Sequence, residues 1–557
     1  MSAVSTPLIR SLLFTNQKPL QSKLHVEVKH NFHFENLELI SSSDAEDHGT
    51  FCEIEPLGEI YPFIKETKQN GLCRTFGLYS LRVSTCPGTG EFSYSRLHIR
   101  AIIDMSDIKA KLQTLIDNAV KDGVAPGLQC VVFNRDEIIF NGVSGFASLP
   151  SEKNPAGEPM TKSSVLWLAS CSRLVVSLIV LHVLDKGLID GISIGDLDNP
   201  DALAKIVPEF SPESGSLVTK IIEGFENGLG PDGRKIIKLR DAKNRVTLRQ
   251  LLTHSSGVGF TLTNPLLWEL INPSDKSVPL FNRFFDGSIR DFSLPLVFEP
   301  GTDYHYGYST EWLGQFVVRG TGKHLRQLFH EIVFEPLKIS PADLWLSPEL
   351  SAHKAEMHVR NKDSPYKFQK IIFDIYSAED GPGEGMAYIA GAGLNASLQA
   401  YAQILQAVVN RDPKIMSPTT WELALKDDFG PRGVKVTRPD FKSMRNEMTY
   451  DVVEFAKTNS ENGTGMNLLQ CKVALVPTLS GRPVGSFGWG GLPNIYYSVD
   501  PATGLGSVVG TQMFPFSDPD MIELRDQIER YEYVGDKYGI EHSESTWELI
   551  YISSRSK

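Results

Sequence analysis

Hydrophobic positions recur with helical spacing directly after Met105. Within Met105–Gly123 the apolar residues stand at positions 108, 112, 115, 116 and 120. Ser106 is a suitable N-cap and Gly123 a suitable end, so the segment predicts an amphipathic helix. The next segment, 128–149, holds two runs rich in β-branched and aromatic residues around the polar turn Asn134–Asp136. That pattern predicts a β-hairpin following the helix.

The middle and the end of the chain differ in pattern. Residues 191–385 are rich in proline and glycine and show helical periodicity only in patches. The predicted elements beyond the hairpin are helices over Thr247–Thr253, Ser309–Gly320, Ser397–Asn410 and about Asp518–Tyr531, and strands between about 486 and 513. This order predicts an α+β fold, in which an antiparallel sheet is flanked by N- and C-terminal helices and carries an inserted all-α domain.

The same pattern predicts the domain boundaries. We expect the α/β part to take about 105–190 and 386–530, with the helical insertion at about 191–385 and a C-terminal tail at 531–557. Residues 1–104 show little periodicity. They are either a small appended domain or an extension from an upstream start codon or retained intron, and we favour the second, with Met105 as initiator.

Cysteine and histidine gather in this N-terminal extension. It holds three of the six cysteines, and five of the thirteen histidines, at positions 25, 30, 33, 48 and 98. It contains no Cys-x-x-Cys pair, and His30 and His33 have no second pair at zinc-finger spacing. The sequence therefore predicts no metal site.

Composition and charge exclude several classes of partner. The net charge of −12 leaves no basic surface for nucleic acid, and the longest apolar run, Leu174–Leu184, is too short to cross a bilayer. Residues 1–21 carry only the short apolar patch Ser11–Phe14, which is a poor secretory signal. Six cysteines in 557 residues form no disulfide framework. We expect a cytoplasmic protein with reduced thiols and neither nucleic acid nor membrane as a partner.

The first candidate for chemistry is Ser170. It precedes the run Leu174–Leu184, which is apolar nearly all round, as expected of a buried helix. Gly187 is the expected end of that helix. Backbone N–H groups at such a helix start favour a developing negative charge. Arg173 follows one turn later on the same helix face. Taken alone, a serine in this place is more often a simple N-cap.

Three further blocks follow Ser170 in order. They are Leu251-Leu252-Thr253-His254-Ser255-Ser256-Gly257, then Pro300-Gly301-Thr302 leading to Tyr306, then Trp489-Gly490-Gly491. Together with Ser170 they closely resemble the serine β-lactamase and penicillin-binding-protein superfamily, on its esterase and fungal acyltransferase (transesterase) branch. The resemblance covers about 105–530 and implies a β-lactamase/transpeptidase-like fold.

The resemblance also implies roles for individual residues. Ser170 would be the nucleophile, Tyr306 the base or proton shuttle, and the backbone N–H groups of Ser170 and Leu492 the oxyanion hole. Gly490 and Gly491 would let the strand approach the substrate closely. Trp489 replaces the family's Lys-Thr-Gly lysine with an apolar wall.

His254, Tyr304 and Tyr308 are further candidates for the site. In this family the histidine of the second block orders its loop, so His254 is expected to be structural and not the base. Tyr304 and Tyr308 lie close enough to Tyr306 in sequence that either could take its place, and otherwise they would pack beneath the loop.

Arg173 stands where the family has a lysine next to the serine. Arginine cannot lose its proton under ordinary conditions, so Arg173 cannot act as a base. It can act electrostatically, on a Ser170 alkoxide and a Tyr306 phenolate. We expect its charge to lower the pKa of Tyr306 toward neutrality.

Two functions remain open. The first is serine-dependent acyl transfer through an acyl-enzyme, as an acyltransferase or esterase acting on an ester or thioester in fungal secondary metabolism. Its partners would be a small-molecule acyl donor and acceptor, with a carrier-protein or coenzyme A thioester as one form of donor, and no cofactor is implied. The alternative is a catalytically impaired relative that binds a small molecule in the same cleft. Trp489 and the lack of an export signal disfavour a true β-lactamase or D-Ala carboxypeptidase.

Overall fold

The computed structural model describes residues 52–55, 63–69, 72–85, 96–103, 105–229, 235–271, 289–340, 342–343, 346–361, 363–364, 366–373, 390–437, 442–452 and 463–533. The chain divides into two compact units, Met1–Ala110 and Lys111–Lys557. Among the described residues, no helix is long and apolar enough to cross a membrane.

The first unit contains a small antiparallel sheet. Its strands are β1 (Cys52–Glu55), β2 (Phe63–Gln69), β3 (Leu72–Thr85) and β4 (Arg96–Ile103). The long strand β3 pairs with each of the other three. The weak periodicity of this segment did not predict these strands. The pair His30 and His33 and most of the C-terminal tail lie outside the described residues.

The second unit is built on an antiparallel eight-stranded sheet. Its order is β15-β16-β17-β18-β19-β5-β6-β7, so the C-terminal strands continue directly into the N-terminal hairpin. The bounds are β5 Gly127–Phe133, β6 Ile138–Ser148, β7 Glu158–Pro159, β15 Thr464–Met466, β16 Lys472–Ala474, β17 Phe487–Gly491, β18 Ile495–Val499 and β19 Gly506–Gly510. The predicted hairpin at 128–149 is β5 and β6.

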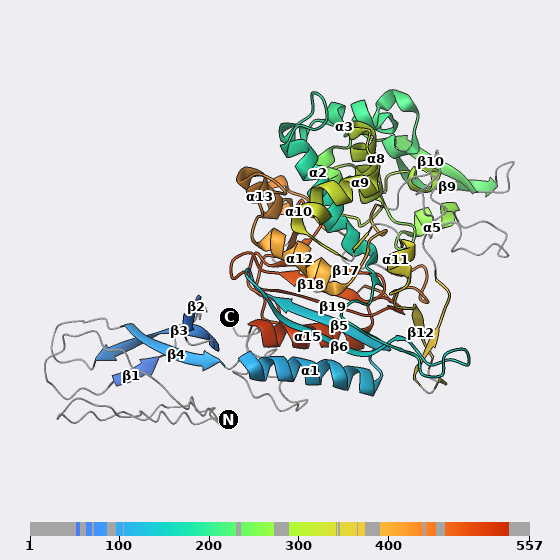
Figure 1. Ribbon diagram of the computed structural model, residues 1–557. Helices are drawn as coiled ribbons and strands as arrows, with labels where there is room; N and C mark the ends of the chain where they lie inside the picture. The colour runs from blue at the N-terminus through green and yellow to red at the C-terminus, as the bar shows by residue number, and fades with distance from the viewer. Residues whose placement is uncertain are drawn as a thin grey trace, which may run out of the picture. The chain divides into compact units, whose positions relative to one another are not determined.

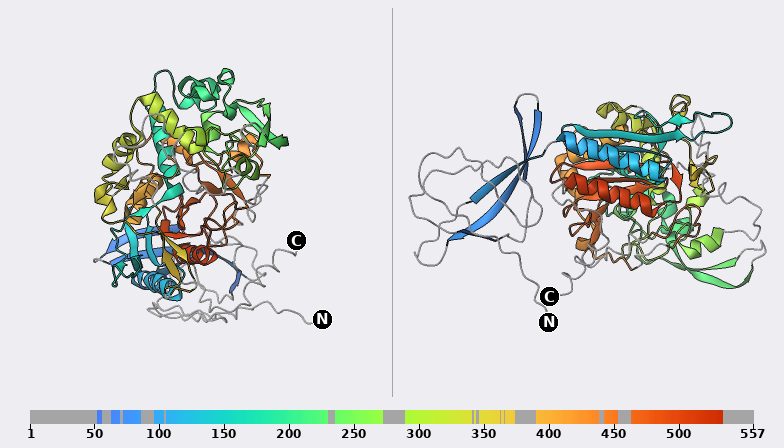
Figure 2. Two further views of the ribbon diagram at one scale, coloured as in Figure 1. Left: turned by 90° about the vertical axis from the view of Figure 1, so that its right-hand side faces the viewer. Right: turned by 90° about the horizontal axis from the view of Figure 1, so that it is seen from below.

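Helices cover both faces of this sheet. The helices α1 (Met105–Asp122) and α15 (Pro519–Tyr533) lie side by side on one face, and α12 (Leu398–Val409) lies on the other (Figures 1 and 2). Because β5 is covered on both faces, all seven of its residues are buried, and apolar residues dominate it. The predicted α+β class, with terminal helices flanking an antiparallel sheet, is confirmed.

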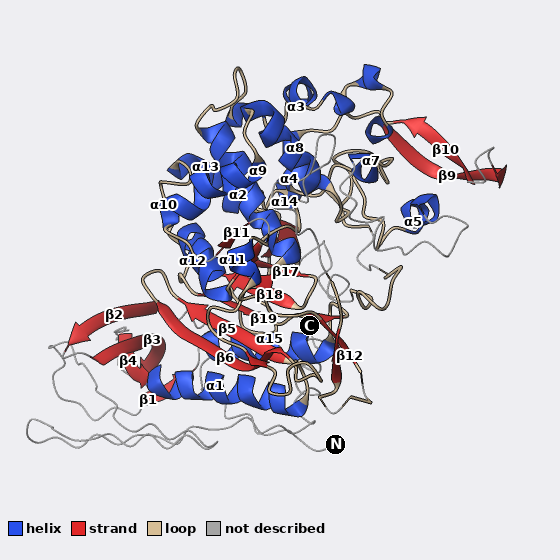
Figure 3. Cartoon of the chain, turned by 45° about the vertical axis from the view of Figure 1, so that its right-hand side comes forward, coloured by secondary structure: helices blue, strands red, loops and turns tan. Residues whose placement is uncertain are grey.

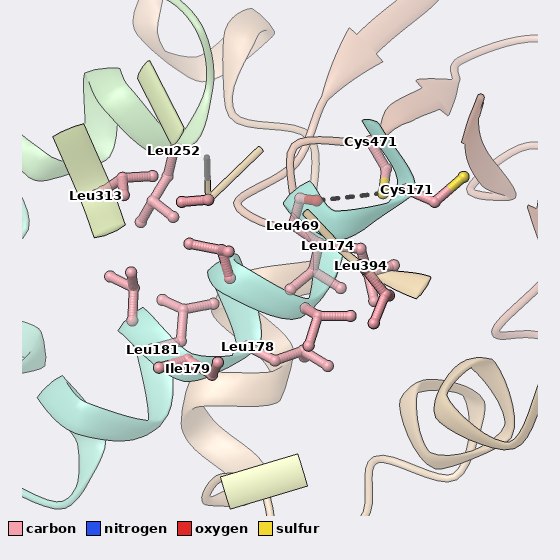
Figure 4. Close-up of a cluster of buried hydrophobic side chains, with 14 of the residues drawn as sticks. Cys171, Leu174, Leu178, Ile179, Leu181, Leu252, Leu313, Leu394, Leu469 and Cys471 are labelled. Atoms are coloured by element: carbon pink, nitrogen blue, oxygen red, sulfur yellow. Dashed lines mark hydrogen bonds between the residues drawn. The ribbon is translucent and has the colours of Figure 1, made fainter. Parts of the chain in front are cut away.

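The helical region is organised around α2 (Ser172–Asp185). Twelve of its residues are buried, as predicted from an apolar run with no polar face, and Gly187 follows its end with φ +61°. Leu174, Leu178 and Leu181 pack with Leu252 and Leu313 from other helices (Figure 4). Each such leucine contributes about 1.5–3 kcal/mol when it is buried. The N-terminal end of α2 is therefore held in a rigid core.

The inserted segment is not purely helical, which corrects the expectation of an all-α insertion. A two-stranded ribbon, β9 (Lys220–Leu229) with β10 (Lys235–Asp241), projects from it (Figure 3). The reason lies in the repeated Ile-Ile pairs and β-branched runs of these two stretches, which a search for helical patches passes over. Short strands also lie in the insertion.

Most of the remaining elements are short, the exception being α8 with 13 residues. The helices are α3 Pro200–Ile206, α4 Leu248–Leu252, α5 Pro265–Ile271, α7 Ile289–Phe292, α8 Ser309–Thr321, α9 Leu325–Phe329, α10 Glu335–Leu337, α11 Pro348–Ser351, α13 Pro418–Leu425 and α14 Phe429–Arg432. The strands are β8 Leu166–Trp167, β11 Ala342–Asp343, β12 His358–Arg360, β13 Phe368–Lys370, β14 Asn395–Ala396 and β20 Met513–Phe514.

Candidate active site

Ser170 lies in a tight turn between β8 and α2. The turn is a 3₁₀ segment, Ala169–Cys171, and α2 begins at Ser172. Ala169 has φ +46°, a left-handed conformation that is strained for a residue with a side chain. The hydroxyl of Ser172 holds the turn, because it donates to the Ala169 carbonyl (2.6 Å) and accepts from the Leu394 N–H (3.0 Å). Ser170 is thereby fixed, half-buried, just before the helix start.

Tyr306 reaches Ser170 directly. Its hydroxyl donates to Ser170 Oγ (2.5 Å) and accepts from Arg173 Nε (2.6 Å), so three residues form one hydrogen-bonded chain. The neighbouring tyrosines point elsewhere: the Tyr308 hydroxyl bonds to Thr261 Oγ1 (2.7 Å), and the Tyr304 ring packs on Phe429. Of the three tyrosines considered from the sequence, the structure brings Tyr306 to the serine.

Arg173 is held by several acceptors in the interior. Nη1 donates to the Gly307 carbonyl (3.0 Å) and to Thr310 Oγ1 (2.6 Å), and its side chain is 4% exposed. Nη1 also lies 3.9 Å from Glu311 Oε2, whose side chain is equally buried. Sequence reasoning missed Glu311, because an acidic residue in the first turn of α8 is ordinarily a partner of the helix dipole.

The Arg173 charge acts to lower the pKa of Tyr306, as expected, but the expectation that this pKa falls toward neutrality is wrong. Burial raises the pKa of Tyr306 above its ordinary value, and this outweighs the opposing effects of the Arg173 charge and the Ser170 hydrogen bond. The negative charge of Glu311 raises that pKa further. The physical reason is that a buried phenolate loses its hydration, while the cation beside it is partly neutralised by a carboxylate.

His254 packs against the site without a hydrogen bond to it. Its ring centroid lies 5.1 Å from that of Tyr306 and 6.5 Å from that of Trp489. Neither ring nitrogen has a hydrogen-bond partner among the described residues. Burial, and then the nearby Arg173 charge, hold the pKa of His254 well below its usual range, so the ring is neutral. The His254 carbonyl accepts from the His305 N–H (3.1 Å) and so ties down the loop that carries Tyr306.

The strand β17 passes close to the nucleophile turn. A Cβ on Gly491 would stand 2.3 Å from the Leu168 carbonyl oxygen, so only glycine permits this approach. Among the described residues, no group accepts a hydrogen bond from the backbone N–H of Ser170 or of Leu492. Gly490 and Trp489 are half-buried beside them. One of these two N–H groups lies in the nucleophile turn and the other directly after β17.

Apolar residues from distant segments surround this strand end. Leu492 packs both with a cluster around Trp167 and Phe514 and with a second around Leu262 and Met448. Trp489 packs with a third cluster, formed by Tyr304, Phe429 and Met466. Apart from Tyr304, which was expected to pack beneath its loop, none of these partners was identified from the sequence, because no motif links segments so far apart.

Metal and thiol chemistry receive no support from the described part of the chain. It contains no group of three or more His, Cys, Asp or Glu residues placed to hold a metal ion. Cys130, Cys171 and Cys471 are free and buried. Burial raises the pKa of the Cys471 thiol to about 12 and that of Cys171 well above its ordinary value, which suppresses the reactive thiolate.

Comparison with known proteins identifies the family of the chain. The family model described as Beta-lactamase matches residues 112–529. An acyltransferase from Penicillium decumbens is 28% identical over 395 residues, covering 69% of this chain and 84% of that protein. A monacolin J acid methylbutanoyltransferase from Aspergillus terreus is 25% identical, covering 73% of this chain and 91% of that protein. A solved variant of the simvastatin synthase from Aspergillus terreus is 25% identical, with a TM-score of 0.60 over 77% of this chain and 97% of that one.

Proposed function

The chain belongs to the β-lactamase family, and we propose that it catalyses acyl transfer through an acyl-enzyme formed on Ser170. The observation that carries this proposal is the hydrogen-bonded chain from Arg173 through Tyr306 to Ser170, with distances of 2.6 and 2.5 Å. A nucleophile, a phenol that can exchange its proton, and a fixed cation are thereby placed in contact. The acyltransferases among its relatives support the same reaction class.

In the proposed reaction, Ser170 Oγ attacks the carbonyl carbon of an ester or thioester. The competent form has Tyr306 as a phenolate, which takes the hydroxyl proton as the new C–O bond forms. The backbone N–H groups of Ser170 and Leu492 stabilise the oxyanion of the tetrahedral intermediate. When this intermediate collapses, the leaving alcohol or thiol takes the proton from Tyr306.

The second half of the reaction reverses these steps. An acceptor alcohol, or water, gives its proton to the Tyr306 phenolate and attacks the acyl carbonyl. Collapse then releases the new ester or the acid, and Ser170 recovers its proton from Tyr306. Arg173 keeps its own proton throughout and stabilises the phenolate by its charge.

The apolar surroundings of β17 favour a neutral, small-molecule substrate. Trp489 stands where a lysine would hold an anionic group, and apolar clusters lie on both sides of Leu492. We infer a hydrophobic acyl donor and a polyketide-like alcohol acceptor of fungal secondary metabolism, with a coenzyme A or carrier-protein thioester as one form of donor. The free, buried cysteines fit a reducing, cytoplasmic compartment.

A second candidate function is ligand binding without turnover. It is favoured by the raised pKa of Tyr306 and by an arginine that cannot act as a base. In that case Ser170 and the β17 strand end would hold a small molecule in the same place without becoming acylated.

Labelling with a fluorophosphonate separates the two. The wild-type chain should gain the mass of one phosphonyl group, and Ser170→Ala should gain none. Ser177→Ala is the matched control, because Ser177 lies on the same helix with its hydroxyl bonded to the Arg173 carbonyl (2.9 Å), and it should still be labelled. A folded wild-type chain that takes up no probe would overturn the proposal in favour of ligand binding.

A further inference from the structure

A buried ion pair lies directly behind the proposed proton acceptor. Arg173 and Glu311 have side chains 4% and 5% exposed, with 3.9 Å between Nη1 and Oε2. Glu311 Oε1 accepts from the Gly391 N–H (3.2 Å), whereas Oε2 has no hydrogen-bond partner among the described residues. A Cβ on Gly391 would stand 2.7 Å from Oε1 and 2.9 Å from the guanidinium carbon. The carboxylate therefore sits beside the cation without a direct hydrogen bond to it.

The groups that face this carboxylate come from three elements. Arg173 faces it from α2 and Tyr306 from the loop before α8, and His254, just after α4, packs against the Tyr306 ring. The second tyrosine of that loop, Tyr304, is also within electrostatic reach of Tyr306 and Arg173. His254 and Tyr304 are neutral in their buried surroundings. His305 is the other titratable neighbour: it lies within electrostatic reach of His254, and its Nδ1 is 2.7 Å from the Tyr306 carbonyl oxygen.

Arg173 carries one positive charge, and two groups compete to neutralise it. One is the Glu311 carboxylate, and the other is the phenolate that Tyr306 must become to accept the Ser170 proton. Both lie within about 4 Å of the guanidinium and out of water, where charges interact strongly. When one of them carries a negative charge, the other is less readily ionised.

We propose that Glu311 is a positioning residue that sets the basicity of Tyr306 by controlling how much of the Arg173 charge is available to it. With Glu311 ionised, Arg173 is compensated and Tyr306 keeps its proton. With Glu311 protonated, the full charge of Arg173 acts on Tyr306, and the phenolate is stabilised. The direction agrees with the effect of the Glu311 charge on Tyr306, since that charge raises the pKa of the phenol while the Arg173 charge lowers it.

The proton balance of this device is simple. The resting site holds a Glu311 carboxylate and a Tyr306 phenol, and the competent site holds a Glu311 acid and a Tyr306 phenolate. The two forms have the same total charge, so one proton moves between two oxygens and none is lost. The inference rests on the proposed function for its catalytic meaning, but the charge competition itself requires no turnover.

The decisive measurement is a titration of Tyr306 by the ultraviolet absorbance of tyrosinate. The chain has seventeen tyrosines, so each protein is compared with the same protein carrying Tyr306→Phe, and the difference isolates one residue. Glu311→Gln should move the ionisation of Tyr306 to lower pH, because a neighbouring negative charge is removed. Glu311→Asp, which withdraws the carboxylate by one methylene group, should move it in the same direction by less. An unchanged or higher midpoint in both variants overturns the inference.

The rate of fluorophosphonate labelling supplies the second readout. The rising limb of its pH profile should move to lower pH in Glu311→Gln, with labelling near neutral pH about tenfold faster than in the wild type. If Glu311 had a purely structural role, Glu311→Gln would slow labelling at every pH and leave the rising limb of the pH profile at the same pH. Glu529→Gln is the matched control, because Glu529 is 2% exposed and pairs with Arg482 (3.1 Å), and it should shift neither readout.

The two proposals can fail separately. If the absorbance midpoint moves but the wild type takes up no probe, the charge competition is supported and acyl transfer fails. If the wild type is labelled at Ser170, but the Glu311 variants shift neither the Tyr306 absorbance midpoint nor the rising limb of the labelling profile, acyl transfer is supported and the role of Glu311 is rejected.

Discussion

The two sides of the candidate site are built in opposite ways. On the α2 and α8 side, Ser170, Tyr306 and Arg173 are joined by short hydrogen bonds, and Glu311 lies against them in the interior. On the β17 side, the half-buried Leu492 packs with apolar side chains. Trp489 is half-buried too and packs on a largely apolar cluster, with the Lys472 ammonium 6.0 Å from its ring centroid. Directional bonds fix where a proton can move, whereas apolar packing fixes only size and shape. Under the proposed function, the first side therefore determines the reaction and the second selects the substrate.

Tyr306→Phe tests the first side and should have the largest effect. Removing the hydroxyl breaks the link between Arg173 and Ser170 without leaving a cavity. We expect fluorophosphonate labelling and ester turnover to fall by about 10²–10⁴-fold, the usual contribution of general-base catalysis. The second-order labelling rate constant measures this directly.

Tyr308→Phe is the matched control for that experiment. It deletes a hydroxyl two residues further along, which bonds to Thr261 (2.7 Å) and lies outside the Ser170 chain. It should cost about 0.5–1.5 kcal/mol of unfolding free energy and leave the labelling rate constant within about twofold. If the two variants slow labelling equally, Tyr306 has no special part in the chemistry.

Arg173→Lys should have the next largest effect. Lysine can keep one contact with Tyr306, but it cannot also donate to Gly307 and Thr310, which arginine bonds at 3.0 and 2.6 Å. We therefore expect ester turnover to fall by about tenfold, with some loss of stability from unpaired buried acceptors. Steady-state kinetics and thermal unfolding check both points. A tenfold rise in turnover would instead mean that arginine hinders ester hydrolysis.

The same contrast explains what the sequence could predict. The nucleophile turn, the tyrosine and the Gly-Gly strand lie in short contiguous motifs, so Ser170, Tyr306 and Trp489 could be named, and the α+β fold and family were predicted correctly. The direction in which the pKa of Tyr306 shifts could not be predicted, because it depends on burial and on Glu311. Only folding places Glu311 near Arg173. The apolar clusters could not be predicted for the same reason, because Trp167, Leu262 and Met448 belong to segments with no shared sequence pattern.

Residues with a strong local pattern were predicted better than residues with tertiary roles. The helix after Ser170 follows from an unbroken apolar run and is α2, and Gly187 ends it as expected. The ribbon β9–β10 was missed within a segment judged to be helical, because neither of its strands shows a strict alternation of apolar and polar residues. Local periodicity identifies an element, but its partners come from the rest of the chain.

Trp489→Phe tests the second side and should have the smallest effect. The smaller ring removes apolar surface but keeps an aromatic group against Tyr306, whose centroid lies 5.3 Å away. Because each buried methylene contributes about 0.8 kcal/mol, losing contact with one or two of them should lower kcat/KM about four- to fifteenfold for long acyl esters relative to acetyl esters. A series of p-nitrophenyl esters of increasing chain length measures this preference.

Trp421→Phe is the comparison for that series, because Trp421 is fully buried in α13 and belongs to the main core. It should lower stability and leave the chain-length preference unchanged. If Trp489→Phe instead lowers kcat equally for every ester, Trp489 acts through Tyr306 and belongs with the hydrogen-bonded side. Trp489 would then belong to the reaction side, and the substrate side would consist of Leu492 and its two apolar clusters.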